Sequence, residues 1–153
     1  MNLKQITKKD QLELKKIYFN SIFSIDEEIY NREQKRAWAS QVWENINFEL
    51  SLSKGKGWLI YKDEMKIAFG LRYPNNKISL LYCMGNLQRK GYGTKLIHKL
   101  EKDAKEECLP FLVTEASLIS YKLFLKNKWQ IIRKEKIIIK NIVFDRYKMI
   151  KIF

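Results

Sequence analysis

The sequence lacks the features that mark membrane and exported proteins. None of its apolar runs approaches the roughly 18 residues that a membrane-spanning helix requires. The N-terminus, Met1 to Gln5, carries no apolar segment of the kind found in signal peptides. We therefore expect a cytoplasmic protein that has no membrane partner.

Residues that bind metals or form disulfides are also scarce, with two cysteines and one histidine in the chain. Cys83 falls in an apolar run and forms no C-x-x-C pair with Cys108, so we expect both thiols to be reduced. His98 stands near the middle of a predicted helix, where we expect a surface or boundary residue and not a catalytic base. This composition argues against a metal site.

Positive charge is in excess, because 30 Lys and Arg residues outnumber 17 Asp and Glu residues and leave a formal net charge of +13. Such an excess can indicate a nucleic-acid-binding protein. Here the lysines are spread along the whole chain, mix with acidic residues and form no basic stripe with interleaved aromatic residues. We therefore favour a solvated lysine-rich surface and expect no nucleic-acid partner.

What the chain does have is the composition of one globular domain. Its 153 residues, 46% of them hydrophobic and 31% charged, are enough to bury a single sizeable core. No linker, repeat or low-complexity segment divides the chain. We therefore predict a single domain spanning residues 1–153.

The segment from Gln88 to Thr94 joins a strand-like run to a helix through two glycines. Before this segment, the run from Ile78 to Met84 is apolar, as in a buried strand. After it, apolar residues recur at helical spacing to about Glu107. The first N–H groups of a helix have no intrahelical partners and carry partial positive charge, so phosphate oxygens bind well there. The segment therefore predicts a polyanion-binding site.

The glycines and the basic residues of this segment support that prediction. Gly91 and Gly93 permit positive φ and have no Cβ atom that would keep a phosphate away from the backbone. Arg89, Lys90 and Lys95 add positive charge. The spacing fits neither the dinucleotide fingerprint nor the Walker motif. A tight strand-to-helix turn without a ligand is the alternative.

The residues from Leu81 to Gly93 resemble the acetyl-CoA signature [RQ]-x-x-G-x-[GA] of the GCN5-related N-acetyltransferase (GNAT) superfamily. The resemblance implies that backbone N–H groups of the loop hold the pyrophosphate of acetyl-CoA, the co-substrate, while the preceding strand holds the pantetheine arm. It assigns cofactor contacts to Tyr82, Cys83, Gln88, Arg89, Lys90, Gly91, Tyr92, Gly93, Thr94 and Phe124.

A second segment, Glu115 to Trp129, resembles the N-x-x-A-x-x-F-Y-x-x-x-G-F region of the same family. The tyrosine of that region protonates the departing CoA thiolate, but Phe124 stands at its position here. Tyr121 lies three residues earlier on the same helix face, so it is a candidate general acid, with a packing ring as the alternative. Glu28, Glu115 and a bound water are all open as the general base.

An aromatic segment precedes a helix that Asn31 and Gln34 are expected to cap. Its pattern from Tyr30 through Gln34 to Trp38 resembles a bacterial, small-molecule branch of the family, in which this helical excursion covers the acceptor site. Tyr30 and Trp38 are therefore candidate substrate-binding residues, with core packing as the alternative. For Trp43 we expect packing between the helices and the sheet.

The pattern of elements predicts an α+β fold of the three-layer type. The expected strands are 3–6, 58–62, 66–72, 77–84, 111–115, 129–134, 136–140 and 142–151. Thr7 and Asp10 are expected to form a capping box before a helix that ends near residues 24–26. A turn is expected at 54–57. Ser117 is expected to cap a helix from Leu118 to about Lys126. Short turns make most of the sheet antiparallel, and the helical crossover makes the pair 77–84 and 111–115 parallel. The GNAT fold that the resemblance implies has this form, with the central parallel pair splayed around the cofactor and helices on both faces.

The predicted function follows from the resemblance. We expect an N-acetyltransferase that transfers an acetyl group from acetyl-CoA to the primary amine of a small molecule, by direct attack in a ternary complex. A peptide or protein acceptor is the nearest alternative, and an open groove over Tyr30 and Trp38 would favour it over a closed pocket. A CoA-binding sensor or interaction module with weak turnover is an alternative from another class. A monomer or a homodimer fits this scheme.

Overall fold

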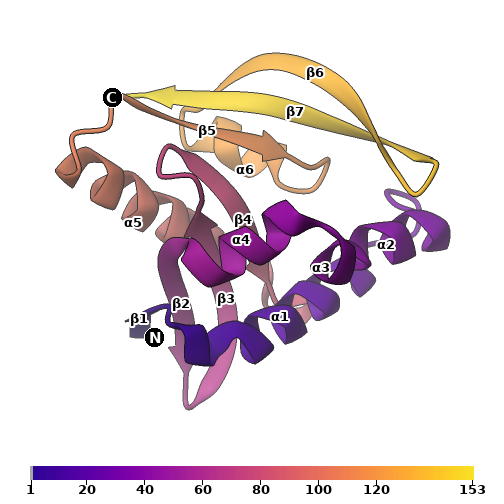
Figure 1. Cartoon of the computed structure of the whole chain (residues 1–153), viewed down its shortest axis with the longest axis horizontal. Helices are drawn as coiled ribbons and strands as arrows, with labels where there is room; N and C mark the ends of the chain where they lie inside the picture. The colour runs from indigo at the N-terminus through magenta and orange to yellow at the C-terminus, as the bar shows by residue number, and fades with distance from the viewer. Residues whose placement is uncertain (1) are drawn as a thin grey trace.

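The computed structural model describes residues 2–153 and contains one mixed seven-stranded sheet (Figure 1). The strand order across the sheet is β1-β2-β3-β4-β5-β7-β6. The strands are β1 (Asn2–Gln5), β2 (Lys56–Lys62), β3 (Met65–Arg72), β4 (Lys77–Cys83), β5 (Phe111–Ala116), β6 (Gln130–Ile139) and β7 (Ile142–Ile152).

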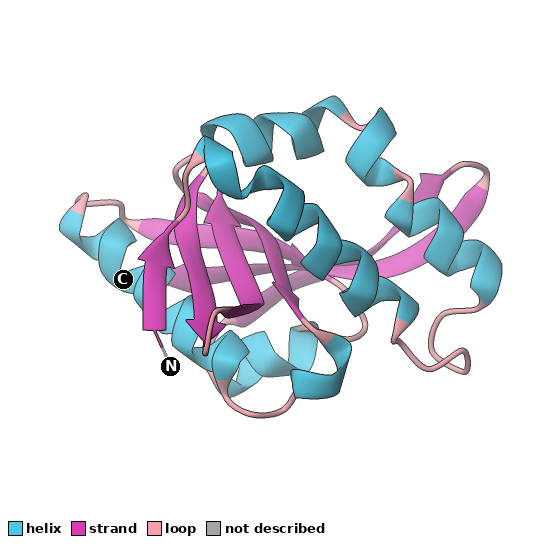
Figure 2. Cartoon of the chain, turned by 90° about the horizontal axis from the view of Figure 1, so that it is seen from below, coloured by secondary structure: helices cyan, strands magenta, loops and turns pink. Residues whose placement is uncertain are grey.

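Helices cover both faces of this sheet, and Figure 2 shows the strands between the two groups. The α-helices are α1 (Gln11–Phe23), α2 (Arg32–Ala39), α3 (Gln41–Glu44), α4 (Ile46–Lys54), α5 (Tyr92–Glu106) and α6 (Tyr121–Lys126). Two 3₁₀ turns, η1 (Lys8–Asp10) and η2 (Gly85–Leu87), precede α1 and the α5 loop. None of the helices in residues 2–153 is both long and apolar enough to span a membrane.

The layers follow from the alternation of side chains along the strands. Phe69 and Leu71 of β3 pack with α1 and α4 in one buried cluster. Ala68, which directly precedes Phe69, points to the opposite face and packs with Leu96 of α5. The buried residues of α1 recur in the sequence at the spacings of three and four that an amphipathic helix requires, and they are Leu14, Ile17, Tyr18, Ser21 and Ile22.

Both predicted capping boxes are present. Asp10 accepts a hydrogen bond from the Thr7 backbone N–H at 2.8 Å. At the start of α2, Asn31 Oδ1 accepts from the Gln34 N–H at 2.9 Å, and Gln34 Oε1 accepts from the Asn31 N–H at 3.0 Å. These bonds satisfy N–H groups that a helix N-terminus would otherwise leave without partners.

The parallel pair predicted at the centre of the sheet is confirmed, and it is short. β4 and β5 pair only at Lys77 with Val113 and at Ile78 with Thr114. The Thr114 hydroxyl donates to the Ile78 carbonyl at 2.8 Å, where the two strands begin to separate. Beyond this point β4 keeps its antiparallel partner β3 and has no partner on its other edge.

Several predicted boundaries and one predicted packing position are wrong. Trp43 is 68% exposed, and Lys15 lies over its ring at 4.8 Å, so it does not fill the space between helices and sheet. Ser117 accepts from the N–H groups of the next turn, and α6 begins only at Tyr121. Gly57 belongs to β2 and not to a turn.

The expected strands 129–134 and 136–140 are one continuous strand, β6. The charged run Lys134-Glu135-Lys136 suggested a break, but β6 lies at the edge of the sheet and most of its side chains are exposed. Charged residues are tolerated in such a position. A register irregularity between Ile131 and Arg133 accommodates the curvature of the strand.

An ion pair between a buried arginine and a partly exposed glutamate fastens the end of α5 to the sheet. The guanidinium of Arg72 donates to Glu107 Oε1 at 2.6 Å and to Oε2 at 3.2 Å, and the Arg72 side chain is 1% exposed. This hydrogen-bonded guanidinium holds the pKa of the Glu107 carboxyl below its usual range. A carboxylate with a lowered pKa stabilises the folded state above its unfolded pKa, and the contribution is lost as the pH falls through the folded value.

We expect Glu107→Gln to lower the free energy of unfolding at pH 7 by about 1–3 kcal/mol, because Arg72 then loses its charged partner. The variant should also lose less stability than the wild type between about pH 5 and pH 3. Urea unfolding across this pH range measures both effects. Glu106→Gln is the matched control, since Glu106 is exposed and lies 3.9 Å from Lys102. Equal stability of the Glu107 and Glu106 variants would contradict the prediction.

Candidate active site

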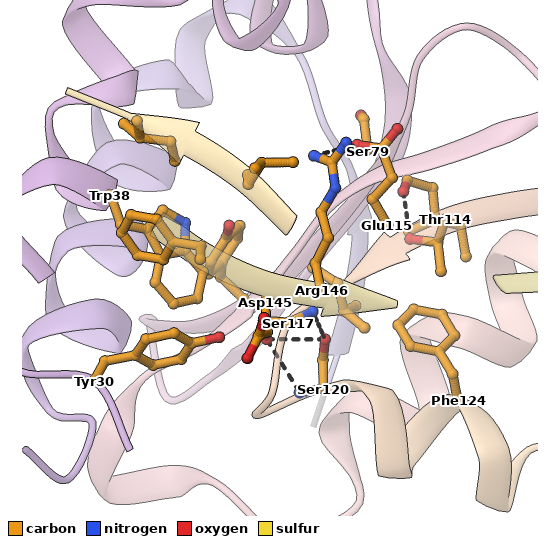
Figure 3. A pocket seen from close by; sticks show the side chains of 16 residues that line it. Tyr30, Trp38, Ser79, Thr114, Glu115, Ser117, Ser120, Phe124, Asp145 and Arg146 are labelled. Atoms are coloured by element: carbon orange, nitrogen blue, oxygen red, sulfur yellow. Dashed lines mark hydrogen bonds and ion pairs between the residues drawn. The ribbon is translucent and has the colours of Figure 1, made fainter. Parts of the chain in front are cut away.

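A cleft of about 160 Å³ lies where β4 and β5 separate. Figure 3 shows Tyr30 and Trp38 on one side of it and Phe124 of α6 on the other. The cleft therefore reaches through the sheet between its two helical layers. Its lining residues come from every layer of the fold and are Tyr30, Trp38, Ile78, Ser79, Leu81, Tyr82, Thr114, Glu115, Ser117, Ser120, Phe124, Ile137, Ile139, Phe144, Asp145 and Arg146.

Aromatic rings form the side of the cleft that faces α2. The ring centroid of Tyr30 lies 5.2 Å from that of Trp38 and 6.0 Å from that of Phe144 on β7. Tyr30 is 2% exposed, and its hydroxyl accepts a hydrogen bond from the Leu118 N–H at 3.0 Å. Burial raises the pKa of Tyr30, so its phenol is neutral at physiological pH. Tyr30 is thus both a packed ring and part of the cleft wall.

Two contacts connect the elements on this side of the cleft. The Tyr30 hydroxyl bond ties the turn before α2 to the segment that precedes α6. Gln34 Nε2 donates to the Val143 carbonyl at 3.3 Å and so connects α2 to β7. The turn before α2 and α2 itself are thereby held against the cleft, which stays open to solvent.

A charged network forms another part of the lining. Arg146 extends from β7 toward Glu115 (Figure 3), and its Nη1 lies 3.0 Å from Glu115 Oε2. Lys77 Nζ lies 2.8 Å from the other oxygen of Glu115, and Arg146 Nε donates to Glu135 at 2.6 Å. These residues connect four strands, β4, β5, β6 and β7, near the point where β4 and β5 part.

Asp145 is the second carboxylate in the cleft. Lys136 Nζ donates to it at 2.7 Å and, as a hydrogen-bonded cation, holds the pKa of Asp145 below its usual range. Asp145 is therefore ionised at neutral pH. Sequence reasoning identified neither Asp145 nor Arg146. The strand itself was predicted. Which of its residues reach a cleft depends on its register with β5, a strand distant in sequence, whose pairing with β7 ends at Tyr147.

The free edge of β4 directs backbone groups into the gap. The Met84 N–H donates to the Ile67 carbonyl of β3 at 2.8 Å, and Cys83 lies opposite Ala68. Because alternate residues of an antiparallel strand direct their N–H and C=O groups to opposite sides, Cys83 and Leu81 direct theirs away from β3. Of the predicted pair, Cys83 therefore presents its backbone to the gap, while Tyr82 lines the cleft with its side chain.

Cys83 has no nucleophilic character in this position. Burial raises the pKa of its thiol to about 11, so the thiol is protonated at neutral pH. Both cysteines are free, and Cys108 is exposed at the end of α5. His98 is exposed on α5, as predicted.

The loop before α5 has the backbone geometry of an anion site. Gly91 has φ +86°, and a Cβ atom built on it would meet nothing within 4 Å. No side chain caps α5, and the N–H groups of Gly91 to Thr94 donate to no acceptor within residues 2–153. Arg89, Lys90 and Lys95 have no acidic side chain within ion-pair distance in the described chain. Unpartnered donors, positive charge and open space therefore coincide at this helix start.

The positive φ expected at Gly93 is wrong, because Gly91 is the one glycine in residues 2–153 with positive φ. A Cβ atom on Gly93 would lie 2.6 Å from Leu123 Cδ2, so this glycine lets α5 approach α6 closely. Gly93 thus fixes the distance between two helices, and Gly91 shapes the loop.

The structure separates Phe124 from Tyr121. Phe124 is 1% exposed, lies with its ring centroid 4.9 Å from that of Trp129, and lines the cleft. Tyr121 stacks on Tyr147 at 4.3 Å and is not among the residues that line the cleft. The geometry therefore favours the packing role for Tyr121 over that of a general acid.

Of the two candidate bases that are side chains, only one lines the cleft. Glu28 is exposed in the turn before α2 and does not line the cleft. Glu115 lines it, but each of its oxygens is within 3.0 Å of a cation. Both oxygens are therefore engaged, and Glu115 can accept a proton only if it gives up one of these contacts.

Comparison with known families decides what kind of protein carries this site. The profile of the Acetyltransferase (GNAT) family matches residues 18–128, which include β4, the loop before α5, β5 and α6. The chain belongs to the GNAT acetyltransferase family. No curated protein matches this GNAT chain significantly.

Solved structures that this GNAT chain resembles carry the same fold. One is a GCN5-related N-acetyltransferase from Rhodopseudomonas palustris, with TM-score 0.91 and 23% identity over 99% of this chain and 95% of the other. Another is the PaiA N-acetyltransferase from Thermoplasma acidophilum in complex with coenzyme A, with TM-score 0.73 and 16% identity over the whole of both chains. A third is a ribosomal-protein-alanine N-acetyltransferase from Brucella melitensis, with TM-score 0.68 and 15% identity over the whole of both chains.

Proposed function

We propose that this GNAT chain transfers the acetyl group of acetyl-CoA to the primary amine of a small molecule, by direct attack in a ternary complex. The observation that carries the choice of acceptor is the small size of the cleft beside Tyr30 and Trp38. Its volume of about 160 Å³ suits a small amine better than an extended peptide. The contacts of Tyr30 with Leu118 and of Gln34 with Val143 hold this side of the cleft in place.

The residues present fit acetyl-CoA as co-substrate. The unpartnered N–H groups at the start of α5 and the open space at Gly91 suit the pyrophosphate. The unpaired edge of β4 offers backbone groups to the pantetheine arm, which carries amides of its own. Arg89, Lys90 and Lys95 add charge that attracts the phosphates.

The chain's own groups account for the chemistry that such a transfer requires. Acetyl-CoA supplies a thioester carbonyl, on whose oxygen negative charge develops during attack. The Leu81 and Cys83 N–H groups that face the gap are suitable donors to that oxygen. The Cys83 thiol is protonated and is therefore a poor nucleophile, so we propose direct transfer and not a covalent acyl-enzyme on this residue.

The acceptor must lose a proton, since an alkyl ammonium has a pKa of about 10. The side chains of Glu115 and Asp145 line the cleft, where their oxygens can accept hydrogen bonds from an amine. Glu115, held by Lys77 and Arg146, is better suited to orient a water or the amine than to accept the proton directly. A water molecule at this carboxylate is the base that the geometry favours.

A panel of acceptors tests the proposal. Amino acids, polyamines, aminoglycosides and short peptides would be assayed for CoA thiol release from acetyl-CoA. Saturable release with a small amine and none with peptides would support it. Release with peptides alone would favour a peptide acetyltransferase, and CoA binding without release from any acceptor would favour a sensor.

We expect Trp38→Leu to raise the acceptor KM by about tenfold or more and to change the CoA Kd by less than twofold. A tenfold change corresponds to about 1.4 kcal/mol, within the range of burying part of an aromatic ring. Steady-state kinetics and CoA titration measure the two quantities. Trp43→Leu is the matched control, because Trp43 is 68% exposed and lies outside the cleft. Equal losses of both affinities, with a lower Tm, would instead mean that Trp38 serves only the core.

A further inference from the structure

A second hollow lies on the chain away from the residues of the acetyl-transfer cleft, between the end of α1 and the start of α2. It has a volume of about 170 Å³, several times the roughly 30 Å³ that a water molecule occupies in the liquid. Its lining residues are Phe23, Glu27, Arg32, Lys35 and Arg36. The two helices that form it are in contact and are seen in Figure 1.

Lys35 is the unusual member of this set, because it is 5% exposed. The other buried charged residues among 2–153 have charged partners: Asp10 pairs with Lys4, Arg72 with Glu107, and Glu101 with Lys151. Lys35 has no carboxylate within 4.0 Å in the described chain. Its ammonium donates only to the Phe23 carbonyl, at 3.5 Å.

A buried ammonium with one long hydrogen bond is costly, since burial of a charge requires compensation by an opposite charge or by several hydrogen bonds. A lysine can donate three hydrogen bonds, and two of these remain for a ligand in the hollow. The Phe23 carbonyl at the end of α1 explains in part why the Lys35 ammonium lies there, but it supplies no full counter-charge.

The other residues of the hollow add to its positive charge. Arg32 is exposed in the first turn of α2 and Arg36 in its last turn, and the hollow contains one carboxylate, Glu27. Arg32 Nε lies 3.2 Å from Glu27 Oε1, which leaves Lys35 and Arg36 without an acidic partner in the described chain. Two free cations therefore face one small cavity.

We propose that this hollow, named here the α1–α2 site, binds a small oxyanion such as phosphate. The Lys35 ammonium and the Arg36 guanidinium hold the oxygens, and Arg32 adds charge from the rim. An anion there supplies the counter-charge that Lys35 lacks, and guanidinium groups suit phosphate oxygens because of their paired donors. A carboxylate group shares this chemistry, so acetate or citrate is the second probe.

The test is thermal unfolding of the full chain in the presence of saturating CoA, which occupies the α5 loop as a competing phosphate site. Inorganic phosphate is titrated against chloride at constant ionic strength. We expect a rise in Tm of about 3 °C at tenfold excess over Kd, which increases further with the logarithm of the phosphate concentration. Acetate and citrate in parallel titrations distinguish phosphate from carboxylate ligands.

Lys35→Met and Arg36→Gln should each abolish most of the rise, whatever their own Tm in chloride. Lys16→Met on α1 is the matched control, because Lys16 is exposed and lies near Glu13 outside the hollow, and it should keep the rise. Arg36→Gln changes an exposed residue, so it remains informative if Lys35→Met does not fold. No rise in the wild type, or an undiminished rise in Arg36→Gln, would overturn the proposal.

Discussion

A Phe124→Tyr variant should have a kcat about 10²-fold higher than the wild type where the departure of the CoA thiolate limits the rate. Phe124 lines the cleft at the position where the family region carries a tyrosine, so the added hydroxyl enters the cleft. A positioned acid contributes typically ~10²–10⁴-fold to such a step. Single-turnover kinetics measure the chemical step directly, without product release.

Tyr121→Phe is the matched control for this prediction. The Tyr121 ring stacks on Tyr147 outside the cleft, so removal of its hydroxyl should change kcat by less than twofold. A large loss in Tyr121→Phe, together with no gain in Phe124→Tyr, would instead identify Tyr121 as the acid. No effect from either variant would mean that the thiolate departs unassisted or to water, since a thiol pKa near ~8.5 makes it a tolerable leaving group.

Gly91→Val should weaken CoA binding by at least tenfold and remove most of the thermal stabilisation that CoA gives. Gly91 has φ +86°, a conformation that costs an ordinary L-residue about 1–2 kcal/mol. Its Cβ would project into the open space beside the unpartnered N–H groups of α5, where the phosphates are expected. Calorimetric titration with CoA measures the affinity, and urea unfolding measures the strain.

Two further variants separate the strain from the obstruction. Asn adopts positive φ more readily than Val, so Gly91→Asn should keep more of the stability and still lose CoA affinity. Gly93→Ala should change stability more than CoA binding, because its Cβ meets Leu123 and not the open space. If Gly91→Val folds and binds CoA as the wild type does, the loop is not the phosphate site.

Local signals explain why the loop and most elements were predictable from the sequence. The two capping boxes and the apolar stripe of α1 depend on residues three or four positions apart, and the structure confirms them. The parallel pairing of β4 and β5 followed from the handedness of a helical crossover. Gly91 was identified because a left-handed residue before a helix is most easily a glycine.

The errors arise where the outcome depends on distant partners. Gly93 was expected to have positive φ and to give space to the ligand, because nothing near it in sequence shows that Leu123 packs against it. Trp43 was expected inside because of its size, yet no element covers it. Asp145 and Arg146 face the cleft only because β7 pairs with β5, and this register is not encoded in either strand alone.

The cleft is bounded by side chains of both faces of the sheet, with Trp38 from one layer and Phe124 from the other. When two substrates enter from opposite faces, neither blocks the path of the other. Either can therefore bind first, and either product can leave first. Such a passage imposes no compulsory order of binding. We therefore expect intersecting double-reciprocal plots and competitive inhibition by CoA against acetyl-CoA at every acceptor concentration.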